Sequence, residues 1–214
     1  MGVRMDNIKI DCMVLGSVQT NCFFLYKEDK KEAIVFDPAD YGKEILDKLQ
    51  TKGITPVAIC LTHGHFDHIL GVAKLKQLAH IEIYANEDEK ELLGNESLNC
   101  SDQVGRLCTV TPDHLLKDGE TFTITGITLQ MIATPGHTSG SCCYYCKEAG
   151  ILISGDTLFE GSVGRTDLPT GSMSAITRSI KDKLFQLPDD TVVYPGHGDS
   201  TTIGDEKKYN PYLA

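Results

Sequence analysis

This chain of 214 residues lacks tryptophan, long apolar runs and any surplus of positive charge. Its longest apolar stretch, residues 57–61, is far shorter than the roughly 20 residues that a helix needs to span a bilayer. It has 20 Lys and Arg residues against 30 Asp and Glu, a formal net charge of −10. Since nucleic-acid binding relies on basic residues to neutralise phosphates, we expect neither a nucleic-acid partner nor a membrane span.

The first ten residues also lack the apolar segment and the small-residue cleavage site of a secretion signal. Without such a signal, the eight cysteines are typical of reduced thiols rather than of a disulfide framework. We therefore expect a cytoplasmic protein. Cys143 and Cys146 have CxxC spacing but fall in a predicted strand, where residues three apart point to opposite faces, so we expect no bridge between them.

The composition is that of a folded protein, with 41% hydrophobic and 23% charged residues, evenly mixed and without repeats. A length of 214 residues predicts a single domain over residues 1–214.

Local patterns predict strands interleaved with helices. The predicted strands cover residues 8–15, 22–26, 33–36, 57–61, 81–84, 121–124, 127–132, 142–146, 151–154 and 191–194. The predicted helices cover residues 40–50 with Asp40 as N-cap, 70–80, 88–93 and 174–187. This order favours an α/β fold with two sheets and helices packed outside them.

The densest group of reactive side chains is the segment THGHFDH, residues 62–68, between a predicted buried strand and a predicted helix. Three imidazoles and one carboxylate within six residues are typical ligands of a first-row metal ion. A solvated polar turn is the alternative, and it explains so dense a pattern poorly. The segment therefore predicts a metal site.

Three further ligand-type residues, His137, Asp156 and His197, each lie just beyond an apolar run. Sheet ends are where open α/β folds place their chemistry, although each residue taken singly fits an ordinary turn. The candidate ligands are His63, His65, Asp67, His68, His137, Asp156 and His197. Seven ligands are too many for one tetrahedral ion and suit two ions that share a bridge.

The segments HGHFDH, PGH, SGD and PGHG, in this order and spacing, resemble the metallo-β-lactamase-fold hydrolases. The resemblance extends from residues 20–22 through 37–38 to 195–197, and it implies a four-layer αββα sandwich of two mixed sheets with helices outside. The segments GDTLF at 155–159 and GRTD at 164–167 further resemble the short, single-domain hydrolases related to glyoxalase II, the hydroxyacylglutathione hydrolases.

The resemblance implies two groups of three metal ligands joined by one shared residue. The first group is His63, His65 and His137, and the second is Asp67, His68 and His197. Asp156 and a water or hydroxide would bridge the two divalent ions, for which zinc is the first expectation and iron or manganese are also suitable. Asp37 would orient a ligand, although a plain Asp-Pro turn fits it equally well.

The implied reaction is attack of the bridging hydroxide on a carbonyl, with Asp67 and Asp156 as the catalytic carboxylates. A thiolate, from a thiol of pKa near 8.5, leaves with little proton assistance. No acid stands out in the sequence beyond the ligand set. We therefore expect hydrolysis of a thioester such as S-D-lactoylglutathione.

The chain departs from full-length glyoxalase II because it ends shortly after His197, so we expect no C-terminal glutathione-binding helical domain. Arg165 stands where those enzymes have a lysine that meets glutathione, and Lys207, Lys208 and Tyr209 form a basic-aromatic tail. Arg165, Lys207 and Tyr209 are thus candidate residues for an anionic small-molecule substrate. A structural ion pair of Arg165 with Asp167 and a solvated tail are the alternative.

Other functions remain open at this point. A persulfide dioxygenase would use one iron on His63, His137 and Asp156, but the PGHG segment supplies a second-site ligand that argues against it. Lactone hydrolysis would use the same two-metal chemistry, and a metal-binding scaffold without turnover is the non-enzymatic alternative. His80 and His114 have no ligand-type neighbours and are predicted to be surface or core residues. The oligomeric state is left open.

Overall fold

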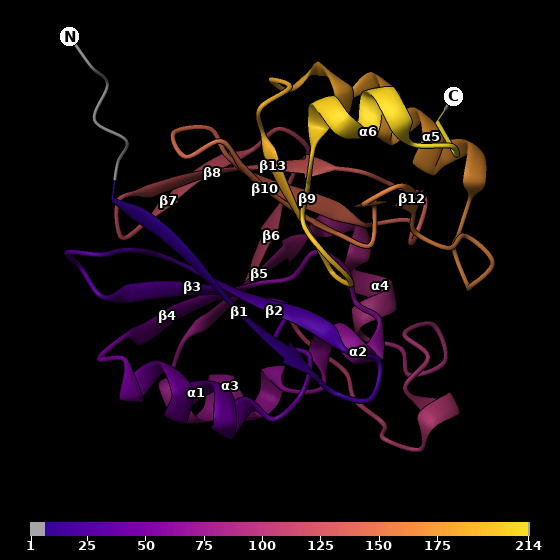
Figure 1. Ribbon diagram of the computed structural model, residues 1–214. Helices are drawn as coiled ribbons and strands as arrows, with labels where there is room; N and C mark the ends of the chain where they lie inside the picture. Colours follow the sequence, from indigo (N-terminus) through magenta and orange to yellow (C-terminus); the bar gives the residue numbers. More distant parts are fainter. Residues whose placement is uncertain (1–6, 214) are drawn as a thin grey trace, which may run out of the picture.

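The computed structural model describes residues 7–213 and contains two six-stranded sheets packed face to face, with helices on both outer sides (Figure 1). The α/β sandwich predicted from the sequence is confirmed. Residues 1–6, on which the expectation about a secretion signal mainly rests, lie outside the described residues. Among residues 7–213, no helix has both the length and the apolar character needed to cross a membrane.

The first sheet has the strand order β1-β2-β3-β4-β5-β6. Its strands are β1 (Ile8–Leu15), β2 (Thr20–Lys27), β3 (Glu32–Phe36), β4 (Thr55–Cys60), β5 (Glu82–Asn86) and β6 (His114–Leu116). The first three strands are antiparallel, and β3 to β6 are parallel, so the sheet is mixed.

The second sheet has the order β14-β13-β10-β9-β8-β7. Its strands are β7 (Thr121–Ile124), β8 (Ile127–Ala133), β9 (Cys142–Cys146), β10 (Ile151–Gly155), β13 (Val192–Pro195) and β14 (Thr201–Thr202). Strands β10 and β13 are parallel and the other neighbours antiparallel. A separate hairpin joins β11 (Leu158–Phe159) to β12 (Ser162–Val163).

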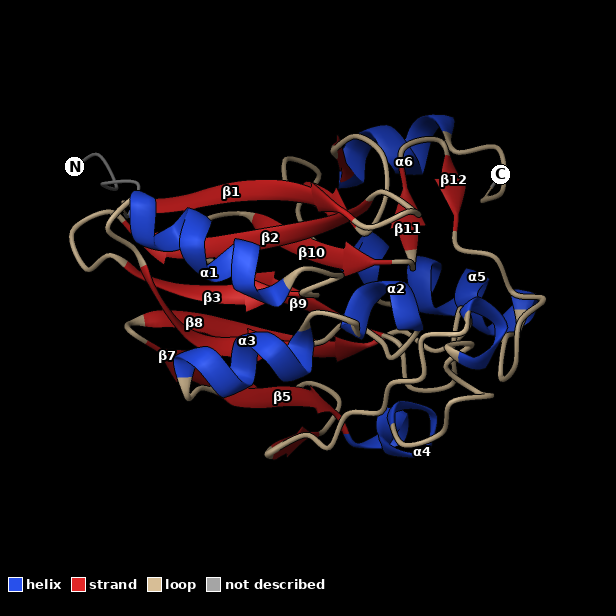
Figure 2. Ribbon diagram, turned by 90° about the horizontal axis from the view of Figure 1, so that it is seen from below, coloured by secondary structure: helices blue, strands red, loops and turns tan. Residues whose placement is uncertain are grey.

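Helices cover the outer face of each sheet (Figures 1 and 2). The first sheet is covered by α1 (Gly42–Thr51) and α3 (Val72–Ala79), and the second by α5 (Met173–Asp182) and α6 (Ile203–Tyr209). Shorter helices are α2 (Phe66–Ile69), α4 (Lys90–Leu93) and the 3-10 helices η1 (Glu87–Glu89), η2 (Asp102–Val104) and η3 (Leu184–Gln186).

Three apolar layers hold this sandwich together. The central layer lies between the sheets, where the rings of Phe36 and Tyr144 have centroids 5.5 Å apart. One outer layer packs α1 and α3 against the first sheet through residues such as Leu49 and Leu75, and the other packs α5 against the second sheet through residues such as Ile180. Burial on both faces explains why several strands are continuously apolar in sequence.

The predicted strands are all present in the structure, with ends that differ by a few residues, but several short elements were missed. Strands β6, β11, β12 and β14 and helix α6 were not predicted, because two to seven residues show too little periodicity. The predicted helix over 88–93 is a 3-10 turn followed by α4, and the one over 174–187 ends at Asp182 before η3. The prediction that Asp40 is the N-cap of α1 was wrong. The carboxylate of Asp40 instead pairs with Arg106, and the N-cap is Tyr41 in a left-handed conformation.

Candidate metal centre

Four loops that follow β4, β8, β10 and β13 meet at one edge of the sandwich. Strands β8, β10 and β13 run in the same direction within the second sheet, so their carboxyl ends lie at the same edge. The loop after β4 approaches them from the first sheet, where the backbone N–H of Cys142 donates to the carbonyl of Thr62 at 2.8 Å. The loops bring all seven candidate ligands together in three overlapping triplets.

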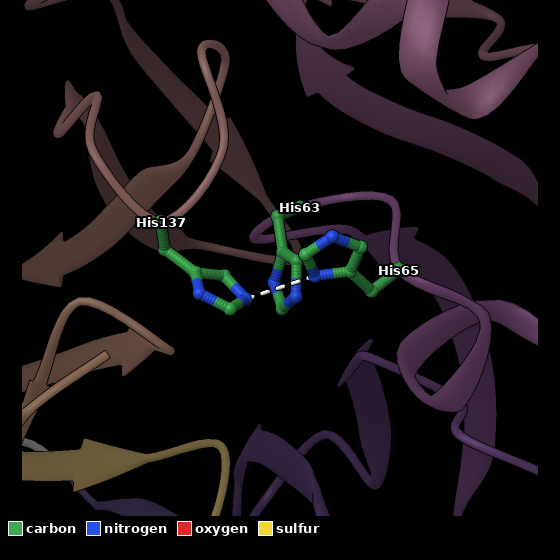
Figure 3. Close-up of side chains that lie close together, drawn as sticks. All are labelled: His63, His65 and His137. Carbon is green, nitrogen blue, oxygen red and sulfur yellow. Dashed lines mark hydrogen bonds between the residues drawn. The ribbon is translucent and has the colours of Figure 1, made fainter. Parts of the chain in front are cut away.

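The first triplet consists of His63, His65 and His137, whose rings point toward one another (Figure 3). Each offers one ligand atom, and these atoms lie within 4.8 Å of one another. Nδ1 of His65 lies 2.9 Å from Nε2 of His137. All three side chains are buried, so their nitrogens are shielded from bulk water.

The second triplet consists of Asp67, His68 and His197. Nε2 of His197 lies 3.3 Å and Nε2 of His68 lies 3.7 Å from Oδ2 of Asp67. Asp67 and His197 are partly exposed, whereas His68 is fully buried. This triplet therefore has an open side.

Asp156 lies between the two triplets. Its Oδ1 is 3.4 Å from Nε2 of His68, and its Oδ2 is 3.5 Å from Nε2 of both His137 and His197. It also forms a third triplet with His63 and His68. One carboxylate thus faces ligands of both groups, which is the arrangement that a bridging ligand requires.

The imidazole of His68 is oriented by a buried carboxylate. Nδ1 of His68 lies 3.0 Å from Oδ2 of Asp37, which directs Nε2 toward the other candidate ligands. Asp37 also accepts hydrogen bonds from the backbone N–H of Thr62 at 2.8 Å and from its hydroxyl at 2.7 Å. The structure thus places Asp37 where a residue that orients a ligand would stand.

Two other histidines are held through the same ring nitrogen. Nδ1 of His137 lies 2.8 Å from the backbone carbonyl oxygen of Arg165, and Nδ1 of His63 lies 3.1 Å from the hydroxyl of Thr62. A hydrogen bond at one ring nitrogen sets the tautomer and leaves the other nitrogen free to bind a metal.

The donor set fits divalent metal ions. Among residues 7–213, several buried side-chain atoms have no hydrogen-bond partner, and four belong to this centre: Nε2 of His63, His65 and His68, and Oδ1 of Asp156. Unpaired buried polar atoms cost free energy, so their convergence needs a bound partner to offset it. Imidazole nitrogens and carboxylate oxygens bind first-row metal ions.

Burial keeps two histidines of the first triplet in the neutral form. It holds the pKa of His63 well below its usual range and lowers the pKa of His65 to about 3, in both cases reinforced by neighbouring imidazoles. Both rings are therefore neutral, the form in which imidazole binds a metal.

Around the second triplet, carboxylates outweigh burial. Burial opposes ionisation of Asp156, but the imidazoles of His68 and His197 hold its pKa well below the usual range. Burial likewise opposes protonation of His197, but hydrogen bonds to Asp156 and Asp67 raise its pKa to about 9. The negative charge of Asp67 and Asp156 is thus concentrated here, as a cation site requires.

Gly196 keeps the space between these ligands open. A Cβ atom at this position would lie 2.2 Å from Oδ1 of Asp156 and 2.7 Å from Cε1 of His68. Only glycine allows the loop before His197 to pass this close, which explains the glycine between Pro195 and His197.

A cavity of about 530 Å³ opens onto the centre. Five candidate ligands line it: His65, Asp67, His137, Asp156 and His197. The rest of its wall is mostly apolar and includes Phe66, Phe159 and Leu168. Among residues 7–213, Arg165 is the one arginine or lysine that lines the cavity. A small organic molecule can therefore reach the ligands from one side.

The structure separates the three predicted substrate residues. Arg165 lines the cavity, and its guanidinium pairs with Asp167 through two contacts of 2.7 Å. Lys207 pairs with Asp189 at 2.5 Å, and Tyr209 lines a different, smaller pocket of about 430 Å³. The expected contribution of Lys207 and Tyr209 to the substrate site therefore gains no support from their positions.

Several residues of the site were not predicted. Thr62 adjoins the histidine motif, so its position was a usable signal, and Phe66 lies within that motif. Asn21 lies in the segment 20–22 that carries the family resemblance but was given no role, and Glu89 has no such signal. Both meet the ligand loops only through tertiary contacts.

Residues predicted to be unrelated to the site do lie away from it. His80 ends α3 in a left-handed conformation, and His114 on β6 pairs with Glu82 at 2.7 Å and stacks on Tyr84. All eight cysteines lie within residues 7–213 and are free thiols there.

Fold and site together define a two-sheet protein with a histidine and aspartate metal centre at the sheet edge. Residues 15–197 match the metallo-beta-lactamase superfamily, and the chain belongs to it.

Several curated relatives match nearly the whole chain. One is the probable metallo-hydrolase YqgX of Bacillus subtilis, 40% identical over 203 residues that cover 94% of this chain and 95% of that protein. Another is the hydroxyacylglutathione hydrolase GloC of Haemophilus influenzae, 34% identical over 213 residues that cover 96% and 98%.

Two solved structures are similar over their full length. BLEG-1, described as a B3 metallo-beta-lactamase, has a TM-score of 0.91 and 40% identity, covering 96% of this chain and 99% of its own. TTHA1623, described in a di-iron-bound form, has a TM-score of 0.85 and 35% identity, covering 95% and 100%. The first expectation from sequence, a metal-dependent hydrolase of this superfamily, is thereby supported.

Proposed function

We propose that this chain is a binuclear metal hydrolase of the glyoxalase II type that cleaves a thioester, with S-D-lactoylglutathione as the candidate substrate. The observation that carries the proposal is the convergence of two ligand triplets on Asp156 beside an open cavity. The likeness to a hydroxyacylglutathione hydrolase supports the choice of substrate.

The candidate ligands form two groups, each of which would bind one ion. The first ion is assigned to His63, His65 and His137, the second to Asp67, His68 and His197, and Asp156 is shared. Two divalent ions would polarise the carbonyl of the substrate and lower the pKa of water toward about 7. Zinc is proposed first, and the di-iron form of a similar protein supports iron as the other candidate.

Asp67 is suited to align a water for attack. It lines the cavity, and its Oδ2 accepts a hydrogen bond from the hydroxyl of Thr20 at 3.2 Å and lies near His197. With this oxygen held, the carboxylate has a defined orientation from which it can accept a proton or a hydrogen bond from water. Asp67 and Asp156 are therefore the proposed catalytic carboxylates.

The cavity wall favours a leaving group that needs no proton donor. Outside the candidate ligands, its lining within residues 7–213 contains no carboxyl and no imidazole. The thiol of Cys100 is present, but burial raises its pKa. A thiolate leaves without an acid, whereas an amide nitrogen requires one. This supports a thioester over an ordinary amide.

Arg165 and the aromatic wall supply the proposed contacts to the rest of the substrate. The guanidinium of Arg165 can meet an anionic group, and Phe66 and Phe159 offer apolar surface to the acyl or thiol portion. Lys207 and Tyr209 are not part of this proposal because they lie outside the cavity. The eight free cysteines support the proposal that the enzyme acts in the reducing cytoplasm.

The test is thiol release from S-D-lactoylglutathione by metal-analysed protein, with and without oxygen. Release that is independent of oxygen is expected. Oxygen uptake with glutathione persulfide, in place of thiol release, would instead establish a dioxygenase. Turnover of a lactone or a β-lactam but not of the thioester would establish the corresponding hydrolase. Two bound metals without turnover of any of these would support a scaffold.

A further inference from the structure

A buried carboxylate outside the ligand set joins the two loops that carry the first triplet. Glu89 ends η1, directly after β5, and is 1% exposed. Its Oε1 accepts hydrogen bonds from the backbone N–H of Gly64 at 2.8 Å and from the hydroxyl of Thr138 at 2.9 Å. Its Oε2 accepts the backbone N–H of Gly140 at 2.9 Å and lies 3.0 Å from the same hydroxyl. Both carboxylate oxygens therefore accept hydrogen bonds.

The donors to this carboxylate adjoin all three histidines of the triplet. Gly64 lies between His63 and His65 in the loop after β4 of the first sheet. Thr138 follows His137 directly in the loop after β8 of the second sheet. Because the triplet combines ligands from two sheets, the spacing of its nitrogens depends on how these loops are held together. Glu89 is bonded to both.

The loop after His137 lies directly against η1. A Cβ atom on Gly140 would lie 2.3 Å from the backbone nitrogen of Glu89. The side chain of Asn86, the N-cap of η1, donates a hydrogen bond to the carbonyl of Gly140 at 2.9 Å. With contacts on both sides of its backbone, this loop has a defined position relative to Glu89.

Burying a carboxyl group between two loops is unfavourable in free energy. The donors to Glu89 are two backbone N–H groups and one hydroxyl, all of them neutral. Burial raises the pKa of Glu89 to about 7, and these hydrogen bonds oppose the shift only in part. The geometry nevertheless needs this group, because the backbone N–H groups of Gly64 and Gly140 face different oxygens of the side chain, and an amide would present an NH2 group to one of them.

We propose that Glu89 is a positioning residue that sets the metal affinity of the first triplet. The inference rests on the proposed function only through its metal site and not on any substrate. The second triplet is held by separate contacts: Asp37 on His68, and the side-chain amide of Asn21, which donates to the carbonyls of Pro195 and Gly198 on either side of His197 at 2.9 Å. Loss of the Glu89 contacts therefore affects one triplet and spares the other.

The test is a stepwise titration of metal-free protein with Co²⁺, followed by visible absorption and by competition with a chelator. Glu89→Gln keeps the size of the side chain but presents an NH2 group to one of the two backbone N–H donors. We expect one binding step to weaken by about 10- to 100-fold and the other to stay unchanged. The matched control is Glu91→Gln, the same substitution at an exposed position of α4, which leaves both steps unchanged.

Double variants assign the weakened step. In a His197→Ala background, which disrupts the second triplet, Glu89→Gln is expected to weaken the remaining step. In a His65→Ala background, which disrupts the first triplet, it is expected to have no effect on the remaining step. The opposite pattern would overturn the proposal.

Two further results would also overturn it. One is that Glu89→Gln binds Co²⁺ with the same affinity as the unsubstituted protein in both steps. The other is equal weakening of both steps together with a lower Tm, which would indicate a general structural role. If Glu89→Gln does not fold, Thr138→Val removes one donor without placing two donors face to face, and an unchanged first step in that variant would count against the proposal. Failure of thioester turnover would leave these titrations unaffected.

Discussion

Asp37 and His68 form a buried pair in which Oδ2 of the carboxylate lies 3.0 Å from Nδ1 of the imidazole. Both side chains are at most 2% exposed. Asp37 directly follows β3 and has a positive φ of 47°, a conformation that Asp tolerates better than most residues. This one contact determines which nitrogen of His68 faces the metal centre.

Asp37→Asn is expected to weaken metal binding because its side-chain NH2 group would replace an acceptor beside His68 or Thr62. Loss of such an orienting partner typically costs 10- to 100-fold in metal affinity or activity. Chelator competition would measure it, with Asp47→Asn, an exposed residue of α1, as the matched control. Unchanged affinity in Asp37→Asn would show that His68 needs no carboxylate partner.

Asp156→Ala and His65→Ala are expected to abolish turnover and lower the metal content. Asp156 faces both triplets, and His65 belongs to one of them, so neither can be replaced by another side chain nearby. His80→Ala, at an exposed position of the same residue type, should change neither quantity. Metal analysis and thiol release would be measured on the same samples. Full activity of Asp156→Ala would refute the two-metal proposal.

Arg165→Ala is expected to raise KM for an anionic thioester about tenfold with little change in kcat, an effect of about 1.4 kcal/mol. The substitution removes the guanidinium from the cavity but retains the backbone carbonyl that accepts from His137. Lys207→Ala, a cation outside the cavity, is the control and should leave KM unchanged. An effect of Lys207→Ala equal to that of Arg165→Ala would instead indicate general electrostatic attraction.

Asn21→Ala is expected to destabilise the protein by about 1–3 kcal/mol, because the buried carbonyl of Pro195 and the part-buried carbonyl of Gly198 lose their donor. For a chain of this size, each kcal/mol lowers Tm by about 2–4 °C. Gln186→Ala, which removes an exposed amide with a single hydrogen bond, should have an effect within about 0.5 kcal/mol. Since the two carbonyls flank His197, a loss of metal from the second triplet should accompany the lower Tm.

The stability of the metal-free protein should depend on pH through Glu89. Its pKa is raised from 4.5 to about 7 by burial, so the unfolded state loses this proton before the folded state does. Between about pH 4.5 and 7 the folded state binds more protons, and stability therefore falls as pH rises, by about 3 kcal/mol in total.

Urea unfolding of the unsubstituted protein and of Glu89→Gln across this range would isolate the effect of Glu89. The difference between their free energies of unfolding should decline from pH 4 to pH 8 and then level off. A difference that is constant with pH would show that Glu89 ionises at the same pH in the folded and unfolded states.

The sequence by itself determined the fold class and the identity of the candidate ligands. His63, His65, Asp67 and His68 are adjacent in the chain, so their density is visible without a structure. His137, Asp156 and His197 each follow an apolar strand, and strand ends are recognisable from local patterns. Local chemistry was therefore sufficient for these residues.

Only the tertiary structure decided which distant groups support or surround that centre. Asp40 had the local pattern of an N-cap, yet it pairs with Arg106, 66 residues away. Glu89 and Asn21 bond to ligand loops of the opposite sheet, and Lys207 lies outside the cavity that Arg165 lines. Such contacts arise from the packing of one sheet on the other, and no periodicity or spacing along the chain encodes which side chains will meet.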